Sequence, residues 1–196
     1  MTTNTPTQST RAAKLLALVV AILGGLMLII GIGTYVGVSV SLRAQNIKVA
    51  TITADAPGPF AGQPVAGPIT AMAQIGVIGH HVSTATGGRT FAQIPNIATS
   101  DGKTYNKDVP ATSASDGQAH AAGSPLTADD AKSYAARITA QQGAWTQASL
   151  YVSVLAFGIA AAIAGLSIVI MLVGVALMKI TGPQAVATAK PGAKTE

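Results

Sequence analysis

Cysteine is absent from this chain of 196 residues, and charged side chains are scarce. Without cysteine the chain has no disulfide, no thiol chemistry and no thiolate-ligated metal. Charged residues make up 10 % of the chain and Glu occurs once, at Glu196, whereas about a quarter is usual in soluble globular domains. Aromatic residues, at 4 %, limit the core that a folded unit could bury. This composition is typical of a membrane protein.

Two long stretches contain no charged residue at all. Leu15 to Leu42 spans 28 residues, and Ala148 to Met178 spans 31. A bilayer core of about 30 Å needs about 20 apolar helical residues, so we predict transmembrane helices at 14–42 and 148–179. The predicted fold is a membrane α-helical protein, a two-pass helical hairpin. Residues 43–147 then form an extracytoplasmic α+β or irregular loop domain of roughly 100 residues. The first stretch is about twice the length of a signal-peptide apolar region, which favours an uncleaved anchor.

Basic residues lie at the end of each stretch that is nearer to a chain terminus, and they predict the orientation in the membrane. Arg11 and Lys14 precede the first, and Lys179, Lys190 and Lys194 lie at the end of the second or follow it. By the positive-inside rule both termini are predicted to be cytoplasmic, as tails 1–13 and 180–196, the first of them disordered. The net charge of +5 is dispersed along the chain, so we expect no nucleic-acid partner. Aromatic anchors are predicted at the outer interface, at Tyr35, Trp145 and Tyr151.

Small residues recur at four-residue spacing in both predicted spans. They are Ala21, Gly25, Gly33 and Gly37 in the first, and Ala156, Ala160 and Ala164 in the second. Small residues on one helix face let two backbones approach closely. The pattern could pair the two spans, could dock another protein, or could reflect the ordinary abundance of Ala and Gly in spans. Neither span contains an ionisable residue of the kind that proton relays and ion paths need, which argues against a transporter or channel acting alone.

The predicted loop has four recognisable parts. Residues 46–52 alternate in a way that suits a strand. A helix is predicted over about 70–86, with Gly87-Gly88 as its stop. Residues 98–126, rich in Ala, Ser, Thr and Gly, are predicted to be flexible and without regular structure. Thr127 is predicted to cap a helix that starts at Ala128 and leads through residues 128–147 directly into the second span.

No motif in the chain predicts catalysis or metal binding. His80 and His81 are adjacent, and neighbouring helical residues point about 100° apart, whereas zinc helices space their histidines at i and i+4. Gly87-Gly88-Arg89 lacks the Lys-Ser/Thr pair of a phosphate-binding loop and is better explained as a helix stop. We therefore predict no catalytic residue, no cofactor and no metal site, and we do not expect an enzyme.

Several segments resemble a group of small two-span actinobacterial membrane proteins. They are residues 42–47 (LRAQNI), 60–68 (FAGQPVAGP), 71–74 (AMAQ), 86–90 (TGGRT) and 148–158 (ASLYVSVLAFG). The resemblance implies an actinobacterial plasma membrane. Such proteins are often called aromatic ring-opening dioxygenases, but non-haem iron oxygenases typically need two His and a carboxylate around the metal. This chain has three His, two of them adjacent, and its one Glu is the last residue.

These features favour a non-catalytic accessory or structural subunit of a larger plasma-membrane complex. Respiratory supercomplexes and envelope machinery are hosts by analogy only. The expected partners are membrane lipid and a larger integral membrane protein complex. The alternative is an extracytoplasmic ligand-binding or sensing module anchored by two helices, with Ala71 to Gly88 bordering a small pocket.

Overall fold

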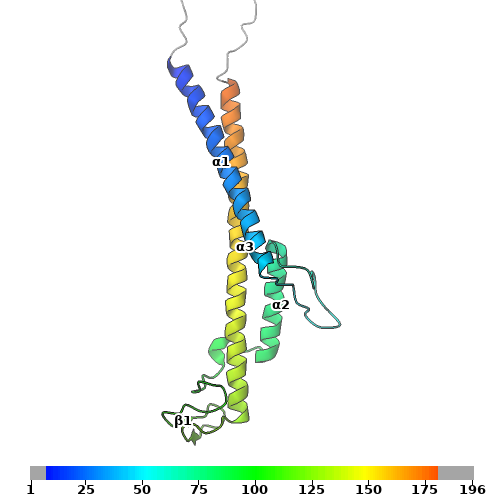
Figure 1. Ribbon diagram of the computed structural model, residues 1–196, viewed down its shortest axis with the longest axis vertical. Helices are drawn as coiled ribbons and strands as arrows, with labels where there is room; N and C mark the ends of the chain where they lie inside the picture. Colours follow the sequence, from blue (N-terminus) through cyan, green and yellow to red (C-terminus); the bar gives the residue numbers. More distant parts are fainter. Residues whose placement is uncertain (1–7, 181–196) are drawn as a thin grey trace, which may run out of the picture. The chain divides into compact units, whose positions relative to one another are not determined.

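The computed structural model describes residues 8–180 and is mainly helical (Figure 1). Its elements are α1 (Gln8–Ala44), α2 (Pro68–Thr86), the 3₁₀ helix η1 (Phe91–Gln93), the two-residue strands β1 (Ala111–Thr112) and β2 (Ala119–His120), and α3 (Ala128–Ile180). The chain divides into two compact units. Unit 1 comprises Met1–Val36 and Ile159–Glu196, and unit 2 comprises Gly37–Gly158. Both α1 and α3 contribute residues to each unit.

Two of these helices are long and apolar enough to cross a membrane, α1 from Arg11 onward and α3. This confirms the helices predicted over the two uncharged stretches. Their large apolar side chains are mostly exposed, for example Ile29 at 69 % and Leu172 at 59 %. A core helix of a soluble protein would bury such side chains, since exposed apolar surface is unfavourable in water. The exposure is therefore the pattern expected of helices that lipid surrounds.

The first helix begins earlier than the sequence predicts. It starts at Gln8, so the prediction of a disordered tail over 1–13 is wrong for residues 8–13. This segment contains Arg11, Ala12 and Ala13, all strong helix formers. Residues 1–7 and the predicted tail beyond residue 180 lie outside the described part of the chain. At its other end α1 stops where Asn46 adopts a left-handed φ of 53°, a conformation that Asn tolerates.

In unit 1, α1 and α3 pack closely through small residues spaced seven apart. The buried small residues are Ala17, Gly24 and Gly31 on α1, and Ala160, Ser167 and Gly174 on α3. The Ser167 hydroxyl donates to the Ile163 carbonyl 2.5 Å away, so no unsatisfied polar group enters the contact. A seven-residue repeat keeps the same helix face toward the partner over several turns.

The glycines in this contact leave no room for a side chain. A β-carbon added at Gly24 would lie 2.7 Å from the Met171 nitrogen, and one at Gly174 would lie 2.6 Å from the Ala21 nitrogen. At Gly31 it would lie 2.9 Å from the Ala164 nitrogen. Residue numbers rise on one helix as they fall on the other, so the pairing is antiparallel. The backbones themselves are in contact, which is how small residues stabilise helix pairs without a hydrophobic driving force.

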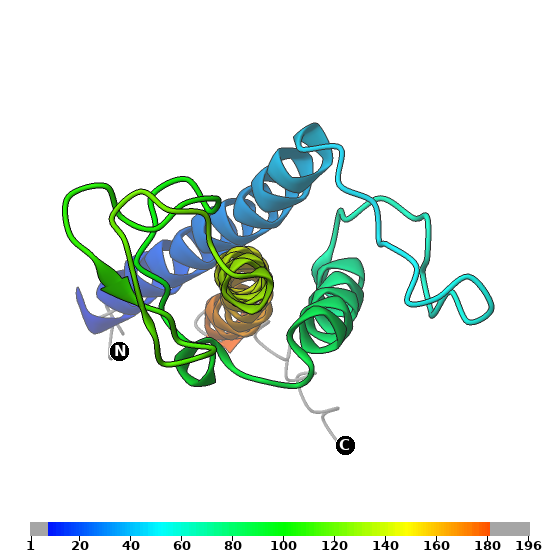
Figure 2. The ribbon, with the colours of Figure 1, turned by 90° about the horizontal axis from the view of Figure 1, so that it is seen from below.

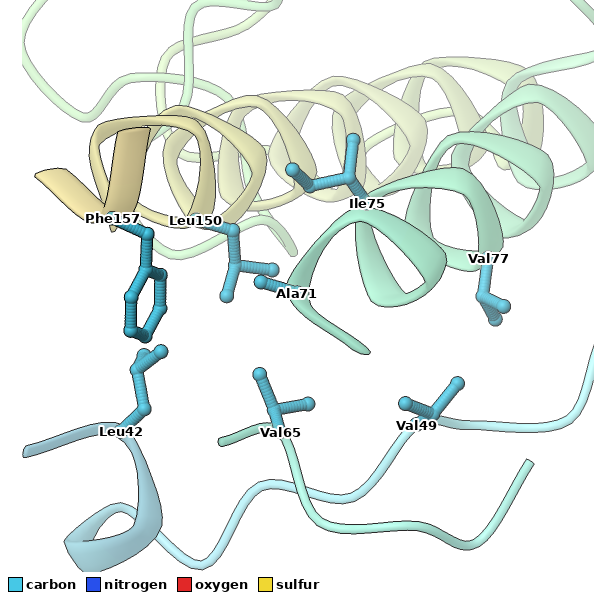
Figure 3. Packing of buried hydrophobic residues seen from close by; sticks show 8 residues of the cluster. All are labelled: Leu42, Val49, Val65, Ala71, Ile75, Val77, Leu150 and Phe157. Carbon is cyan, nitrogen blue, oxygen red and sulfur yellow. The ribbon is translucent and has the colours of Figure 1, made fainter. Parts of the chain in front are cut away.

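In unit 2, the main apolar core joins four segments of the chain (Figure 3). Its buried members are Leu42 of α1, Val49 and Val65 of the segment between α1 and α2, Ala71, Ile75 and Val77 of α2, and Leu150 and Phe157 of α3. The connecting segment folds back on itself: the Val49 nitrogen donates to the Gln63 carbonyl at 2.9 Å, and the Val65 nitrogen to the Ile47 carbonyl at 2.8 Å. Apolar residues from both arms of this segment thereby reach the core.

The strand predicted at 46–52 does not form. This stretch makes a single antiparallel bridge, between Lys48 and Pro64. Proline has no N–H to donate to a ladder, and Pro57, Pro59 and Pro64 all lie on the returning arm. Ile47, Val49, Ala50 and Ile52 all contact the core, so the two-residue alternation of a strand does not continue past Val49.

The helix predicted at about 70–86 is confirmed as α2, which begins at Pro68. Proline suits the first helical position because its missing N–H would be unpaired there anyway. Gly87 ends the helix at φ 64°, and the Gly88 nitrogen donates to the Ser83 carbonyl at 2.7 Å, a glycine-dependent helix stop. Figure 2 shows α2 beside α3. The Gln147 side chain donates to the Ile75 carbonyl at 3.0 Å, and Gly143 leaves space for Val82.

The helix predicted from Ala128 is also confirmed, as α3, and the Thr127 hydroxyl accepts the Asp130 N–H at 3.1 Å. Residues 98–126 contain more structure than the sequence predicted. β1 and β2 pair antiparallel within them, and Tyr105 is buried at 1 % exposure. The Asp101 carboxylate accepts the N–H groups of Thr104 and Lys103, each at 2.8 Å. These bonds hold the pKa of Asp101 well below its usual value. Whether the segment is flexible stays a prediction.

A bulky residue at Gly31 should break the helix pair, whereas the same residue at Gly33 should not. Gly31→Leu places a side chain against the α3 backbone, and such overpacking costs about 1–3 kcal/mol. The free energy of unfolding of detergent-solubilised protein, followed by circular dichroism during titration with SDS, should fall by that amount. Gly33→Leu is the matched control and should leave it nearly unchanged. Equal losses for both variants would contradict the pairing described above.

Candidate interaction surfaces

The structure divides the predicted helix-packing residues of unit 1 into two sets. Ala21, Ala160 and Ala164 line the contact between α1 and α3. Gly25 and Gly33 do not, because an added β-carbon at either would meet no described atom within 4 Å. The four-residue pattern in the sequence does not include the glycines that make the contact, which are Gly24, Gly31 and Gly174. Gly24 and Gly31 are instead spaced seven residues apart, and this spacing is their signal in the sequence.

The two remaining predicted packing residues belong to unit 2. Gly37 is exposed, and within the described chain an added β-carbon there would also meet no atom within 4 Å. Ala156 is half-buried. A partner for either residue therefore stays a prediction.

The predicted aromatic anchors are all exposed, but they lie in different units. Tyr35 belongs to unit 1 and is 40 % exposed, whereas Trp145 and Tyr151 belong to unit 2 and are 66 % and 53 % exposed. Six residues separate Trp145 from Tyr151, which is about 9 Å along a helix axis. Exposure of large aromatic side chains on a membrane helix is typical of interfacial anchors. That the three share one interface stays a prediction.

An apolar groove lies in unit 2 where the start of α2 meets α3. Its volume is about 470 Å³, and its lining includes Pro59 and Phe60 of the connecting segment, Ile69, Met72 and Ala73 of α2, and Val154 of α3. Ile69 is 66 % exposed and Met72 is 48 % exposed. No charged side chain lines the groove. Concave apolar surface of this kind is typical of sites where proteins bind a ligand, lipid or another protein.

A second, smaller cleft lies at the opposite end of α2. It measures about 250 Å³ and is lined by residues from Thr84 to Gly87 together with Arg89, Lys132 and Ala136. Two cations give it the charge to attract an anion. Two polar side chains of the cleft already donate hydrogen bonds to the backbone, however. The Thr84 hydroxyl donates to the His80 carbonyl at 3.0 Å, and Arg89 Nε donates to the Thr86 carbonyl at 3.1 Å.

The histidines do not converge. The rings of His80 and His81 are 6.1 Å apart between centroids and inclined by 61°. His81 Nε2 lies 3.2 Å from the Ile52 carbonyl oxygen, while His120 stacks on Tyr105 at 4.8 Å and lies 3.2 Å from the Asp116 carboxylate. Within residues 8–180 no three His, Asp or Glu side chains are grouped so that they could hold a metal ion.

The one fully buried carboxylate of the described residues anchors the 98–126 segment to α3. Asp130 accepts the Tyr105 hydroxyl at 2.6 Å and the Ser115 N–H at 3.0 Å, and it is 0 % exposed. Burial by itself would raise the pKa of Asp130, but the hydrogen bonds from Tyr105, Ser113 and Ser115 outweigh burial and lower the pKa. Asp130 and Tyr105 are 25 positions apart in the sequence, and no local pattern places them together.

Loss of this buried carboxylate should destabilise the protein, and the effect should depend on pH. A folded-state pKa below the unfolded value means that the charge stabilises the fold above about pH 4 and that this contribution is lost as the pH falls through the folded pKa. Asp130→Asn should therefore cost about 1–3 kcal/mol of unfolding free energy at pH 7. The difference from the wild type should shrink at pH 3.

Urea unfolding of the full chain in detergent micelles at both pH values measures this effect. Asp129→Asn is the matched control, because Asp129 is the exposed neighbour of Asp130 on the same helical turn. Tyr105→Phe should reproduce part of the loss at pH 7. A loss in Asp130→Asn no larger than that in Asp129→Asn would show that the buried carboxylate does not anchor the segment.

Comparison of the chain with protein-family models, with curated proteins and with solved structures finds no match. The resemblance to the two-span actinobacterial group therefore stays a hypothesis that depends on the segments named above. Any function has to be inferred from the surfaces and clusters of this chain itself.

Proposed function

We propose that this chain is a non-catalytic accessory subunit, held in the plasma membrane by α1 and α3, that docks against a larger integral membrane protein. The observation that carries the proposal is a set of glycines in unit 1, of which Gly33 and Gly165 are exposed and Gly25 is half-buried. Gly25 and Gly33 lie on α1 outside the contact with α3, and Gly165 on α3 is likewise open among the described residues. The proposal places the chain with the two-span actinobacterial proteins that it resembles, and respiratory or envelope complexes are its hosts by analogy.

Glycine at these positions does nothing for the chain by itself. It lowers helix propensity by about 1 kcal/mol relative to alanine, and it offers lipid no side chain to pack against. The contact with α3 uses Gly24 and Gly31, so the intramolecular pairing does not account for Gly25 or Gly33. A second helix that approaches as closely as α3 does would account for them, because small residues at a contact allow backbone packing.

Substitution at Gly33 should release the chain from its partner. Gly33→Leu fills the surface that the second helix is proposed to occupy, and about 1–3 kcal/mol of overpacking weakens binding by roughly fivefold to a hundredfold. Affinity purification after extraction in a mild detergent, with mass spectrometry, measures the partner recovered. Ile32→Leu is the matched control, since Ile32 is the exposed neighbour of Gly33. Recovery of the wild-type chain alone, as a monomer or a homodimer, would contradict the proposal.

We further propose that both termini are cytoplasmic and that residues 43–147 lie outside the cell. The basic residues near both tails support this orientation. The chain has no cysteine, so a single introduced cysteine reports its own location without background. A membrane-impermeant maleimide applied to spheroplasts should label Asp108→Cys, an exposed position of unit 2, and should label Thr3→Cys only after the membrane is opened. The reverse pattern would invert the topology.

The alternative function is an extracytoplasmic ligand-binding or sensing module, and one observation favours it. The cleft beside Arg89 and Lys132 is lined in part by Thr84 to Gly87, which lie within the segment 71–88 that this hypothesis assigns to a pocket. It ranks second because the carbonyl end of α2, which carries the negative end of the helix dipole, contributes to the same cleft and weakens its attraction for an anion.

A further inference from the structure

We infer that the apolar groove of unit 2 binds the acyl chain of a bilayer phospholipid, so that the start of α2 and the Phe60 turn are immersed in the outer leaflet. The inference goes beyond the proposed function, which concerns docking in unit 1, but it depends on α3 crossing the bilayer. It concerns one surface, the groove lined by Pro59, Phe60, Ile69, Met72, Ala73 and Val154.

A polarity gradient along α2 is the first observation. The helix has no charged residue, and the chain from Ala56 to Gly88 has none either. At its start the exposed side chains are apolar, namely Ile69 and Met72, whereas at its end they are His80, His81, Ser83 and Thr84. A surface helix in water shows apolar and polar residues on opposite faces along its whole length. A change from apolar to polar along the axis instead fits a helix that passes from hydrocarbon into water.

The direction of this gradient agrees with α3. The first turns of α2 share a core with Leu150 and Phe157, which lie in the uncharged stretch of α3. The last turns of α2 meet Gly143, through Val82 and Ile78, and Val82 packs against Ala136 and Ala140. The apolar end of α2 therefore lies beside the part of α3 that enters the membrane, and the polar end lies beside the part that precedes it.

One wall of the groove belongs to the uncharged stretch of α3. That wall is formed by Val154. The side chains that line the groove are apolar, so hydrocarbon can enter without leaving a donor or acceptor unpaired. A volume of about 470 Å³ is within the range of ligand sites. A flexible acyl chain fits an open apolar groove of this kind.

Two cations of unit 2 are the candidates for contact with the phosphate of such a lipid. Arg43 and Lys48 are the only Lys or Arg residues between Lys14 and Arg89. Both are exposed, and each is the direct neighbour of a core member, Leu42 or Val49. Basic residues next to apolar membrane-embedded surface attract lipid phosphate, each by about 1 kcal/mol.

Spin labels on single cysteines test the immersion in the full chain. In liposomes of phosphatidylcholine and phosphatidylglycerol, Met72→Cys should carry a label that collides several-fold more often with oxygen than with a water-soluble nickel chelate. Ser83→Cys, at the polar end of the same helix, should show the opposite preference. Water-like behaviour at position 72 would overturn the inference.

A third label separates this outcome from failure of the proposed function. Leu172→Cys reports whether α3 lies in the bilayer at all. A lipid-exposed label at position 172 with a water-exposed label at position 72 would contradict the lipid immersion of the groove but not the membrane span of α3. Water exposure at both positions would contradict the membrane span as well.

Occupancy of the groove has its own test. A phosphatidylcholine with a photoactivatable diazirine in its acyl chain should cross-link to the peptide that contains Met72. Ala73→Leu, which places a larger side chain at the groove wall, should reduce this cross-linking several-fold while circular dichroism stays unchanged. Cross-linking that Ala73→Leu leaves unchanged, or cross-linking of the peptide to another protein in native membranes, would show that lipid is not the occupant.

Discussion

Every segment described here depends on contact with one continuous helix, α3. In unit 1 its backbone packs closely against α1 at Gly24 and Gly31. In unit 2 its side chains Leu150 and Phe157 enter the core that α2 and the connecting segment complete, and Asp130 in its first turn holds Tyr105. A chain without disulfides and with few aromatic residues has little else to hold its irregular segments. Continuity of α3 through 53 residues is the constraint on which the remaining structure depends.

The length of the uncharged stretch in α3 has two separate causes. Residues 159–178, which belong to unit 1, would extend about 30 Å at the rise of an α-helix, which matches a bilayer core. Residues 148–158 belong to unit 2, where Leu150 and Phe157 are buried against protein. The same holds for α1, in which Leu42 is buried in that core. The uncharged run thus combines a segment long and apolar enough to cross a membrane with residues that are buried in a protein core.

The sequence predicts those features whose signals are local. Proline at position 68, the Gly87-Gly88 stop and the cap at Thr127 each act within one helical turn, and α2 and the start of α3 follow from them. Features that depend on distant partners were missed. The seven-residue row of Gly24 and Gly31 has meaning only once α3 supplies Ala160, Ser167 and Gly174. Likewise, Tyr105 and Asp130 are 25 residues apart, and the intervening chain gives no sign that they meet.

Different interactions stabilise the two ends of unit 2. Beyond residue 98, carboxylates fix the chain: Asp101 and Asp130 accept hydrogen bonds, and those bonds lower the pKa of each. Near Phe157 and Leu42 the contacts are apolar. The backbone groups there that need a partner form hydrogen bonds with amide and hydroxyl side chains; for example, the Gln74 side chain accepts the Ala50 N–H at 2.8 Å. Charged groups that accept hydrogen bonds are well suited to a water-facing region, whereas apolar surface left exposed there would be unfavourable. This division between hydrogen-bonded carboxylates at one end and apolar contacts at the other is what the proposed position of unit 2, at the boundary between water and hydrocarbon, requires.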